Sequence, residues 1–167
     1  MAGPDAPRLT AVVAEALARA GQRGVLATGW GGLSAGNSPD RDHVFVLREA
    51  PHSWLFPRVA AVVHHGGAGT THEGLRWGRP TLACPVFGDQ PFWGRRVAAL
   101  GAGPRSIPQR SITTEVLADA IRGLATDPRM RERARTLGES IRSERGVTVA
   151  VDAIGQELQK AVSPEAG

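Results

Sequence analysis

The chain has 167 residues, of which 41% are hydrophobic, and a formal net charge of +4. This length suffices for one domain with a sizeable core. No apolar run approaches the roughly 20 residues that a membrane helix needs, so we expect no integral membrane segment. The first residues lack the order of a signal peptide, which predicts a cytoplasmic location. The single cysteine, Cys84, excludes an internal disulfide and a cysteine-built metal site, and its apolar surroundings predict a buried, inert thiol.

The positive charge is almost entirely arginine, since Lys160 is the only lysine. A basic balance can indicate binding to nucleic acid. Here sixteen acidic residues dilute the arginines, so the signal is weak. We therefore predict no nucleic-acid partner and keep a nucleotide- or nucleic-acid-binding module as the alternative function.

The first half of the chain alternates helical and strand patterns. "RLTAVVAEALARAG" has apolar residues at helical spacing and Gly21 as a stop signal. "GVLAT" predicts a short buried strand that runs into the glycine-rich loop "GWGGLSAG", and "HVFVL" predicts a second strand. After a turn at Pro57 a third strand is expected at about 60–63. Trp54, in "HSWLFP", is expected in the core.

The second half starts with the loop "HHGGAG" and a helix at about 70–77. "PTLACPV" predicts a fourth strand and "QPFWGRRVAALG" a helix that Gly101 closes. Three further helices are predicted, one capped by a threonine and the next with Asp127 as its N-cap and Pro128 at its first position.

Continuous apolar strands that alternate with helices predict an α/β fold, a Rossmann-like parallel sheet with helices on both faces and a helical C-terminal segment. We expect one domain over residues 1–162 and a frayed tail at 163–167. Ligands of such sheets bind beyond the carboxyl ends of the strands. The stretch "VVHHGGAGTTHEGLRWG", residues 62–78, lies at one of these ends.

A metal site is the first interpretation of this stretch. Candidate ligands are His64, His65, His72 and Glu73. In "HEGLR", however, Arg76 stands where a zinc-protease helix needs its second histidine. We therefore predict no metal site.

A tight turn is the second interpretation. Glycines allow the chain to reverse between strand and helix, and threonines at a helix start are ordinary caps. This accounts for each residue alone but explains poorly why paired histidines precede the glycines and paired threonines follow them.

A phosphate site is the third interpretation and uses every residue. The N–H groups and the dipole of a helix start favour an anion, and glycines let it approach the backbone. Thr70 and Thr71 add hydroxyls, and His65 near a phosphate is pushed toward its protonated form. The stretch is neither a Walker loop, since it lacks "GK[ST]", nor the dinucleotide fingerprint, since His72 stands where Gly or Ala is needed.

"HHGGAGTT", followed by "GRPTLACPVFGDQPFWG" and preceded by "APHSWLFPRVAAVV", resembles the C-terminal, nucleotide-sugar-binding domain of GT-B glycosyltransferases. The similarity is greatest to bacterial antibiotic (macrolide and glycopeptide) and sterol glycosyltransferases. It runs over about residues 2–162.

The resemblance implies a role for individual residues. It places the donor diphosphate against His65, Gly67, Gly69, Thr70 and Thr71. It places the ribose against Glu73 and the base against Ala50, Pro51 and His52, and it implies that Asp89 and Gln90 bind the sugar hydroxyls. It implies no cofactor beyond a UDP- or TDP-sugar as donor substrate.

The resemblance also implies inverting hexosyl transfer from that donor to a lipophilic hydroxyl acceptor, such as a sterol or macrolide. Related enzymes are about twice as long, with an N-terminal domain that binds the acceptor and supplies the general base. We expect that domain, or a partner subunit, to be needed for turnover, so that this chain alone binds the donor without catalysis. The family's usual first strand of this domain, ending in a "GS" turn, is also lacking here. We therefore expect either a marginally stable monomer or a homo-oligomer that covers the gap.

Overall fold

The computed structural model describes residues 6–28 and 43–162. The predicted loop "GWGGLSAG" spans residues 29–36, and the predicted tail is 163–167, so both fall outside the described residues. The helices and strands are α1 (Ala6–Ala20), β1 (Gly24–Ala27), β2 (Val44–Leu47), α2 (His52–Leu55), β3 (Val62–His64), α3 (Ala68–Arg76), β4 (Thr81–Ala83), α4 (Gln90–Ala99), α5 (Thr114–Thr126), α6 (Pro128–Ser143) and α7 (Gly146–Val162).

The four described strands form two parallel pairs. β1 pairs with β2 from Gly24 opposite Val44, and β3 pairs with β4, with His64 opposite Ala83. The predicted strands and their parallel direction are confirmed. The described residues nevertheless hold two separate two-stranded sheets, whereas the sequence pattern predicted a single one.

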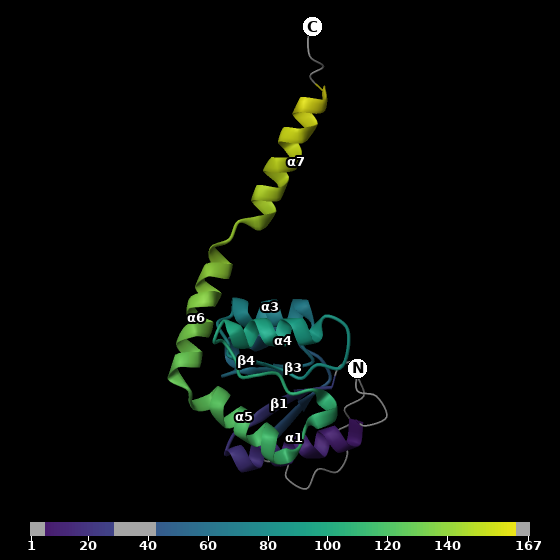
Figure 1. The fold of residues 1–167 in the computed structure, drawn as a ribbon, viewed down its shortest axis with the longest axis vertical. Helices are drawn as coiled ribbons and strands as arrows, with labels where there is room; N and C mark the ends of the chain where they lie inside the picture. The colour runs from purple at the N-terminus through teal and green to yellow at the C-terminus, as the bar shows by residue number, and fades with distance from the viewer. Residues whose placement is uncertain (1–5, 29–42, 163–167) are drawn as a thin grey trace.

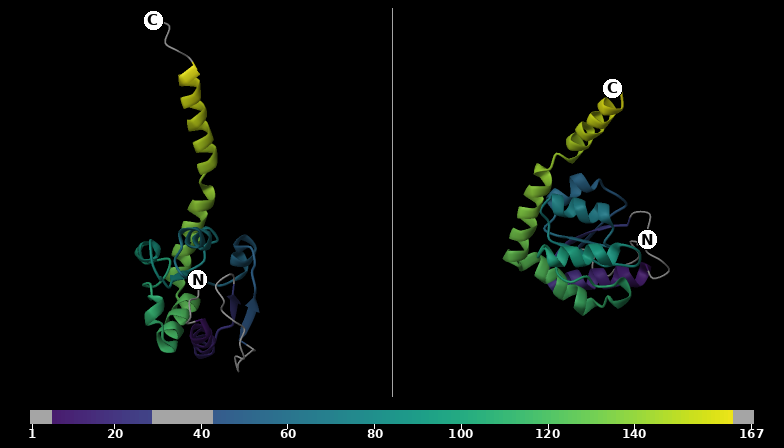
Figure 2. Two further views of the ribbon diagram at one scale, coloured as in Figure 1. Left: turned by 90° about the vertical axis from the view of Figure 1, so that its right-hand side faces the viewer. Right: turned by 45° about the horizontal axis from the view of Figure 1, so that its top comes forward.

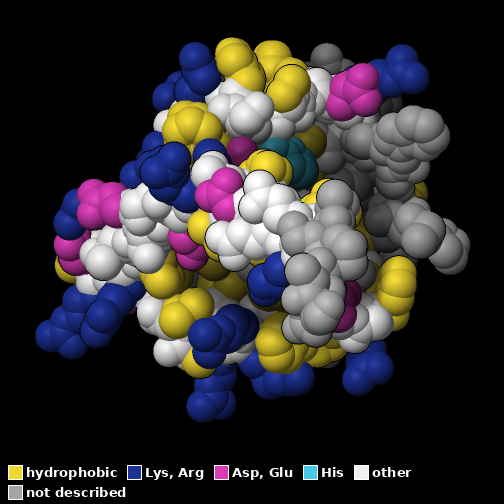
Figure 3. Space-filling view, turned by 90° about the horizontal axis from the view of Figure 1, so that it is seen from above, with side chains coloured by type: hydrophobic (Ala, Val, Ile, Leu, Met, Phe, Trp, Pro, Cys, Tyr) yellow, Lys and Arg dark blue, Asp and Glu magenta, His cyan; other side chains and the backbone are white. Residues whose placement is uncertain are grey.

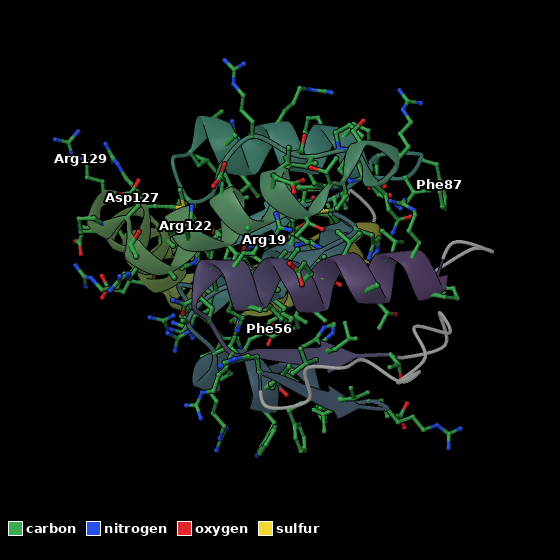
Figure 4. All side chains as sticks on the ribbon, turned by 90° about the horizontal axis from the view of Figure 1, so that it is seen from below. Arg19, Phe56, Phe87, Arg122, Asp127 and Arg129 are labelled. Atoms are coloured by element: carbon green, nitrogen blue, oxygen red, sulfur yellow. The ribbon has the colours of Figure 1, made fainter. Side chains whose placement is uncertain are left out.

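The larger hydrophobic core lies between α1, α5 and β4 (Figure 1). The apolar face of α1 packs on that of α5, and Leu82 of β4 is fully buried in the same cluster. At the rim of this helix pair Arg19 bridges Glu15 and Glu115, and Arg122 donates to the carbonyl of Arg19. Figure 4 shows both arginines along the α1–α5 contact.

A second core cluster lies on the other side of β3 and β4, between α3, α4 and α6 (Figures 1 and 2). The described residues place Leu75, Val97, Ala102 and Ala134 in it. α3 and α6 approach closely because Gly138 has no side chain: a Cβ there would lie 2.7 Å from the backbone N of Gly78. This packing fixes α3, and therefore the loop that precedes it.

The predicted helix caps are confirmed. Thr113 accepts from the N–H of Val116 at the start of α5. Asp127 accepts from the N–H groups of Arg129 and Met130 at the start of α6, where Pro128 takes the first position. Carboxylate caps of this kind satisfy N–H groups that lack intrahelical partners.

Cys84 is buried, as predicted, and burial raises the pKa of its thiol to about 12, so the thiol stays protonated. The prediction for Trp54 was wrong. Its side chain is 53% exposed, and the guanidinium of Arg58 lies 4.7 Å above its ring. Its apolar neighbourhood in the sequence suggested burial, but it lies on the short helix α2, and the residue buried in this segment is Phe56, directly after that helix.

α7 extends away from the body of the molecule in every view (Figures 1 and 2). Five large apolar side chains of α7 are exposed: Val147, Val149, Val151, Ile154 and Leu158. Of the helices in the described ranges, α7 included, none combines the length and apolarity needed to cross a bilayer.

Candidate functional site

The loop that joins β3 to α3 presents the uncapped start of a helix. α3 begins at Ala68, two residues earlier than predicted, with Gly67 as N-cap and no side-chain cap hydrogen bond. The first N–H groups of a helix have no intrahelical acceptor, and the helix dipole places partial positive charge there. An anion is the natural partner for such a terminus when no side chain caps it.

His65 lies at the mouth of this loop. Its side chain is exposed, and its ring lies against Gly67, where a Cβ would come within 2.5 Å of Nε2. Partial burial lowers the pKa of His65, and the nearby Asp89 carboxylate opposes that shift. The free site therefore holds a neutral imidazole at pH 7, and a bound anion would favour its protonation.

The two threonines of the loop are not equivalent. Thr71 is only 1% exposed, and its hydroxyl donates to the carbonyl of Gly67 at 2.9 Å. Thr70 is half-buried, and Gly69 is exposed with open space where a Cβ would be. The arrangement favours Thr70 over Thr71 as a hydroxyl donor to a ligand and gives Thr71 the role of bracing the helix start.

A second loop follows β4 and ends at α4. Gln90 is buried, and its Oε1 accepts the N–H groups of Val86 at 2.8 Å and Phe87 at 3.2 Å, so this amide shapes the loop. Asp89 is exposed, and its Oδ2 accepts the indole N–H of Trp93 at 2.8 Å. Asp89 therefore offers its carboxylate to solvent in a fixed orientation, whereas Gln90 has its carbonyl oxygen committed.

The two loops touch each other at Gly66. This residue has φ 92°, and a Cβ on it would lie 3.0 Å from the carbonyl oxygen of Gln90 and 3.3 Å from Cβ of Ala83. Only glycine combines this backbone conformation with such a close approach. The predicted diphosphate and sugar residues are thus brought together at the carboxyl ends of two paired strands.

Glu73 lies one turn into α3, half-buried, and its Oε1 accepts the indole N–H of Trp77 at 2.7 Å. The predicted base-binding residues lie elsewhere, at the end of β2. Ala50 is half-buried, Pro51 caps α2 with its carbonyl, and the His52 ring stacks on Phe56 with centroids 4.5 Å apart.

Sequence reasoning missed the two tryptophans that orient acidic residues of the site. Trp77 follows Glu73 by four residues, and Trp93 follows Asp89 by four. Residues four apart on a helix are neighbours on one face, so this spacing carried a usable signal.

The described residues bring no three His, Cys, Asp or Glu side chains together as metal ligands. The rings of His64 and His65 lie edge to face with centroids 5.9 Å apart.

The face seen in Figure 3 carries histidine, acidic and hydrophobic side chains next to one another, with lysine and arginine mainly around its rim. Phe87, on the loop between β4 and α4, points outward from the body in Figure 4 and is 58% exposed.

Comparisons with known proteins show the family of this chain. Residues 36–154 match the family model of the erythromycin biosynthesis protein CIII-like C-terminal domain. A sterol 3-beta-glucosyltransferase, UGT80A2 of Arabidopsis thaliana, is 47% identical over 154 residues, which is 92% of this chain and 24% of the relative.

Two solved structures share the fold. The glycotransferase of kitacinnamycin is 30% identical with a TM-score of 0.77, over 87% of this chain and 38% of that one. Glycosyltransferase VinC, solved in complex with DTDP, is 25% identical with a TM-score of 0.67, over 85% and 36%. The chain thus spans about a quarter of the curated relative and well under half of each solved structure. The chain belongs to the family of EryCIII-like C-terminal domains of GT-B glycosyltransferases.

Proposed function

We propose that this chain is the donor-binding domain of an inverting glycosyltransferase that uses a UDP- or TDP-sugar. The observation that carries the proposal is the contact between the uncapped start of α3 and the loop of Asp89 and Gln90, made through Gly66. An anion site and a sugar-hydroxyl acceptor lie side by side there, as a diphosphate and its sugar require. The DTDP bound to VinC supports a nucleoside diphosphate as the ligand.

Each residue has a chemical task in this proposal. In transfer, the acceptor oxygen forms a bond to the anomeric carbon, the bond from that carbon to the diphosphate breaks, and the diphosphate leaves with the electron pair. The N–H groups at the start of α3, the Thr70 hydroxyl and protonated His65 stabilise the developing negative charge. The Asp89 carboxylate accepts hydrogen bonds from sugar hydroxyls. Glu73 takes the ribose, and Ala50, Pro51 and His52 approach the base.

The acceptor hydroxyl must also lose a proton to a base held near the anomeric carbon. The family resemblance assigns His52, His64 and His72 to the nucleotide side of the proposed site. We propose that another domain or subunit binds the acceptor and supplies the base. By analogy with the relatives, the acceptor is a sterol or macrolide hydroxyl. This chain alone then binds donor without turnover, and product formed from UDP-glucose and an acceptor panel by the purified chain would contradict this division.

Titration of the purified chain with UDP, TDP, UDP-glucose and duplex DNA tests donor binding. We expect UDP- or TDP-sugar affinities between micromolar and millimolar that EDTA leaves unchanged. Steeply salt-dependent DNA binding without any nucleotide effect would instead identify a nucleic-acid-binding module.

A further inference from the structure

His64, the last residue of β3, is turned toward the loop that follows it. Its Nδ1 accepts the N–H of Gly66 at 2.9 Å. A nitrogen that accepts a hydrogen bond carries no proton, so the neutral imidazole has its proton on Nε2. That Nε2 is buried and has no hydrogen-bond partner within the described parts of the chain. A buried unpaired donor costs stability, so a benefit elsewhere is expected to offset it.

The hydrogen bond from the Gly66 N–H to Nδ1 of His64 offsets this cost by restraining Gly66. Gly66 has φ 92°, and a Cβ added to it would lie only 3.0 Å from the carbonyl oxygen of Gln90 and 3.3 Å from Cβ of Ala83. Glycine without an anchor samples both signs of φ with similar ease. His64 therefore restrains a glycine of the loop at the point where that loop comes close to the first residue of α4.

We propose that His64 is a positioning residue for donor binding: its Nδ1 turns the Gly66 N–H inward, so that Gly67 and the start of α3 face the diphosphate. This inference rests on the proposed function, since it assigns the diphosphate to this loop. His64 itself does not touch the ligand.

The surroundings of His64 keep its nitrogen an acceptor. Burial is the largest cause, and together with the charges of His65 and of His52 on α2 it lowers the pKa of His64 to about 4. Nδ1 therefore stays available across the neutral range. A protonated ring would present a donor to the Gly66 N–H and break the contact.

Two amide substitutions separate the role of the hydrogen-bond acceptor Nδ1 from the role of the ring itself. His64→Asn places an amide oxygen near the position of Nδ1, whereas His64→Gln reaches the position of Nε2 and offers nothing next to Gly66. We expect UDP to bind His64→Asn within about twofold of the unchanged chain, and His64→Gln and His64→Ala about fivefold to tenfold more weakly. If His64 acted only by packing its ring, the Asn and Gln variants would both lose the ring, and their UDP affinities would fall by the same factor.

Amide hydrogen exchange provides a second measurement that needs no ligand. Gly66 N–H should exchange slowly in the unchanged chain and in His64→Asn, and faster in His64→Gln. Equal UDP affinities in all variants, or equal losses in Asn and Gln with no difference in Gly66 exchange, would overturn the proposal. Absence of UDP binding by the unchanged chain would instead overturn the proposed function itself and, with it, the role given to His64.

Discussion

The indole N–H of Trp93 donates to Oδ2 of Asp89 at 2.8 Å, across one turn of α4. This contact fixes the direction of a carboxylate that is otherwise exposed. Asp89→Ala should therefore weaken UDP-sugar binding by about 1.5–3 kcal/mol, the usual contribution of hydrogen bonds to a charged group, and leave UDP binding unchanged. Trp93→Phe, which keeps the carboxylate and removes its donor, should weaken sugar binding less. Calorimetric titration with both ligands measures the difference, and an equal loss for UDP and UDP-sugar would show that Asp89 is structural.

Replacement of His65 should affect the nucleotide itself. His65→Ala removes a charge-assisted contact to the diphosphate, and we expect it to cost about 1.5–3 kcal/mol of UDP binding. His64→Ala should cost less, because its imidazole contacts the backbone of Gly66 rather than solvent. The same UDP titration ranks the two variants. The reverse order would show that the diphosphate contact is wrongly assigned to His65.

Diphosphate binding should take up a proton at His65. In the free chain, partial burial lowers the pKa of His65 below its ordinary value, so the imidazole is neutral at pH 7. A bound diphosphate raises that pKa, and the affinity for UDP therefore rises as the pH falls from neutral toward the free-state pKa. Titration in two buffers of different ionisation enthalpy measures the proton uptake. His65→Gln corrects for protonation of UDP, and identical uptake in both chains would contradict the prediction.

The buried imidazole of His64 should make the fold less stable in mild acid. Its pKa is about 4 in the folded chain and near 6.5 when unfolded, so between these values only the unfolded state binds the proton. The free energy of unfolding should then fall by about 2 kcal/mol between pH 7 and pH 5 through this group alone. Urea unfolding of the unchanged chain and of His64→Asn at both pH values isolates the effect, since the two chains differ in no other titratable group. Parallel pH dependence of the two chains would be the contrary result.

A matched pair of glycine substitutions tests the helix packing that supports the site. A Cβ on Gly138 would lie 2.7 Å from the backbone N of Gly78 and 2.8 Å from the carbonyl oxygen of Leu75. Gly138→Ala should therefore force α6 from α3 and destabilise the fold by about 1–3 kcal/mol. Gly123, within α5, has open space at its Cβ position, so Gly123→Ala should stabilise by up to about 1 kcal/mol. Thermal unfolding compares the two variants. Similar melting temperatures would show that the α3–α6 contact can accommodate the added methyl group.

Local chemistry in the sequence determined most of the elements and the place of the ligand loop. The strand ending at His64, the glycines after it and the helix that carries Glu73 are each readable from apolar periodicity and turn residues, because those signals act over a few positions. The caps at Thr113 and Asp127 followed from the same local rules.

Tertiary structure decided how these elements meet. The contact of Gly66 with Gln90, the inward hydroxyl of Thr71 and the exposure of Trp54 depend on which segments pack together across the chain. The division of the strands into two pairs depends on long-range pairing in the same way. No local pattern specifies such contacts, because their free energy comes from surfaces that become neighbours only after the chain has folded.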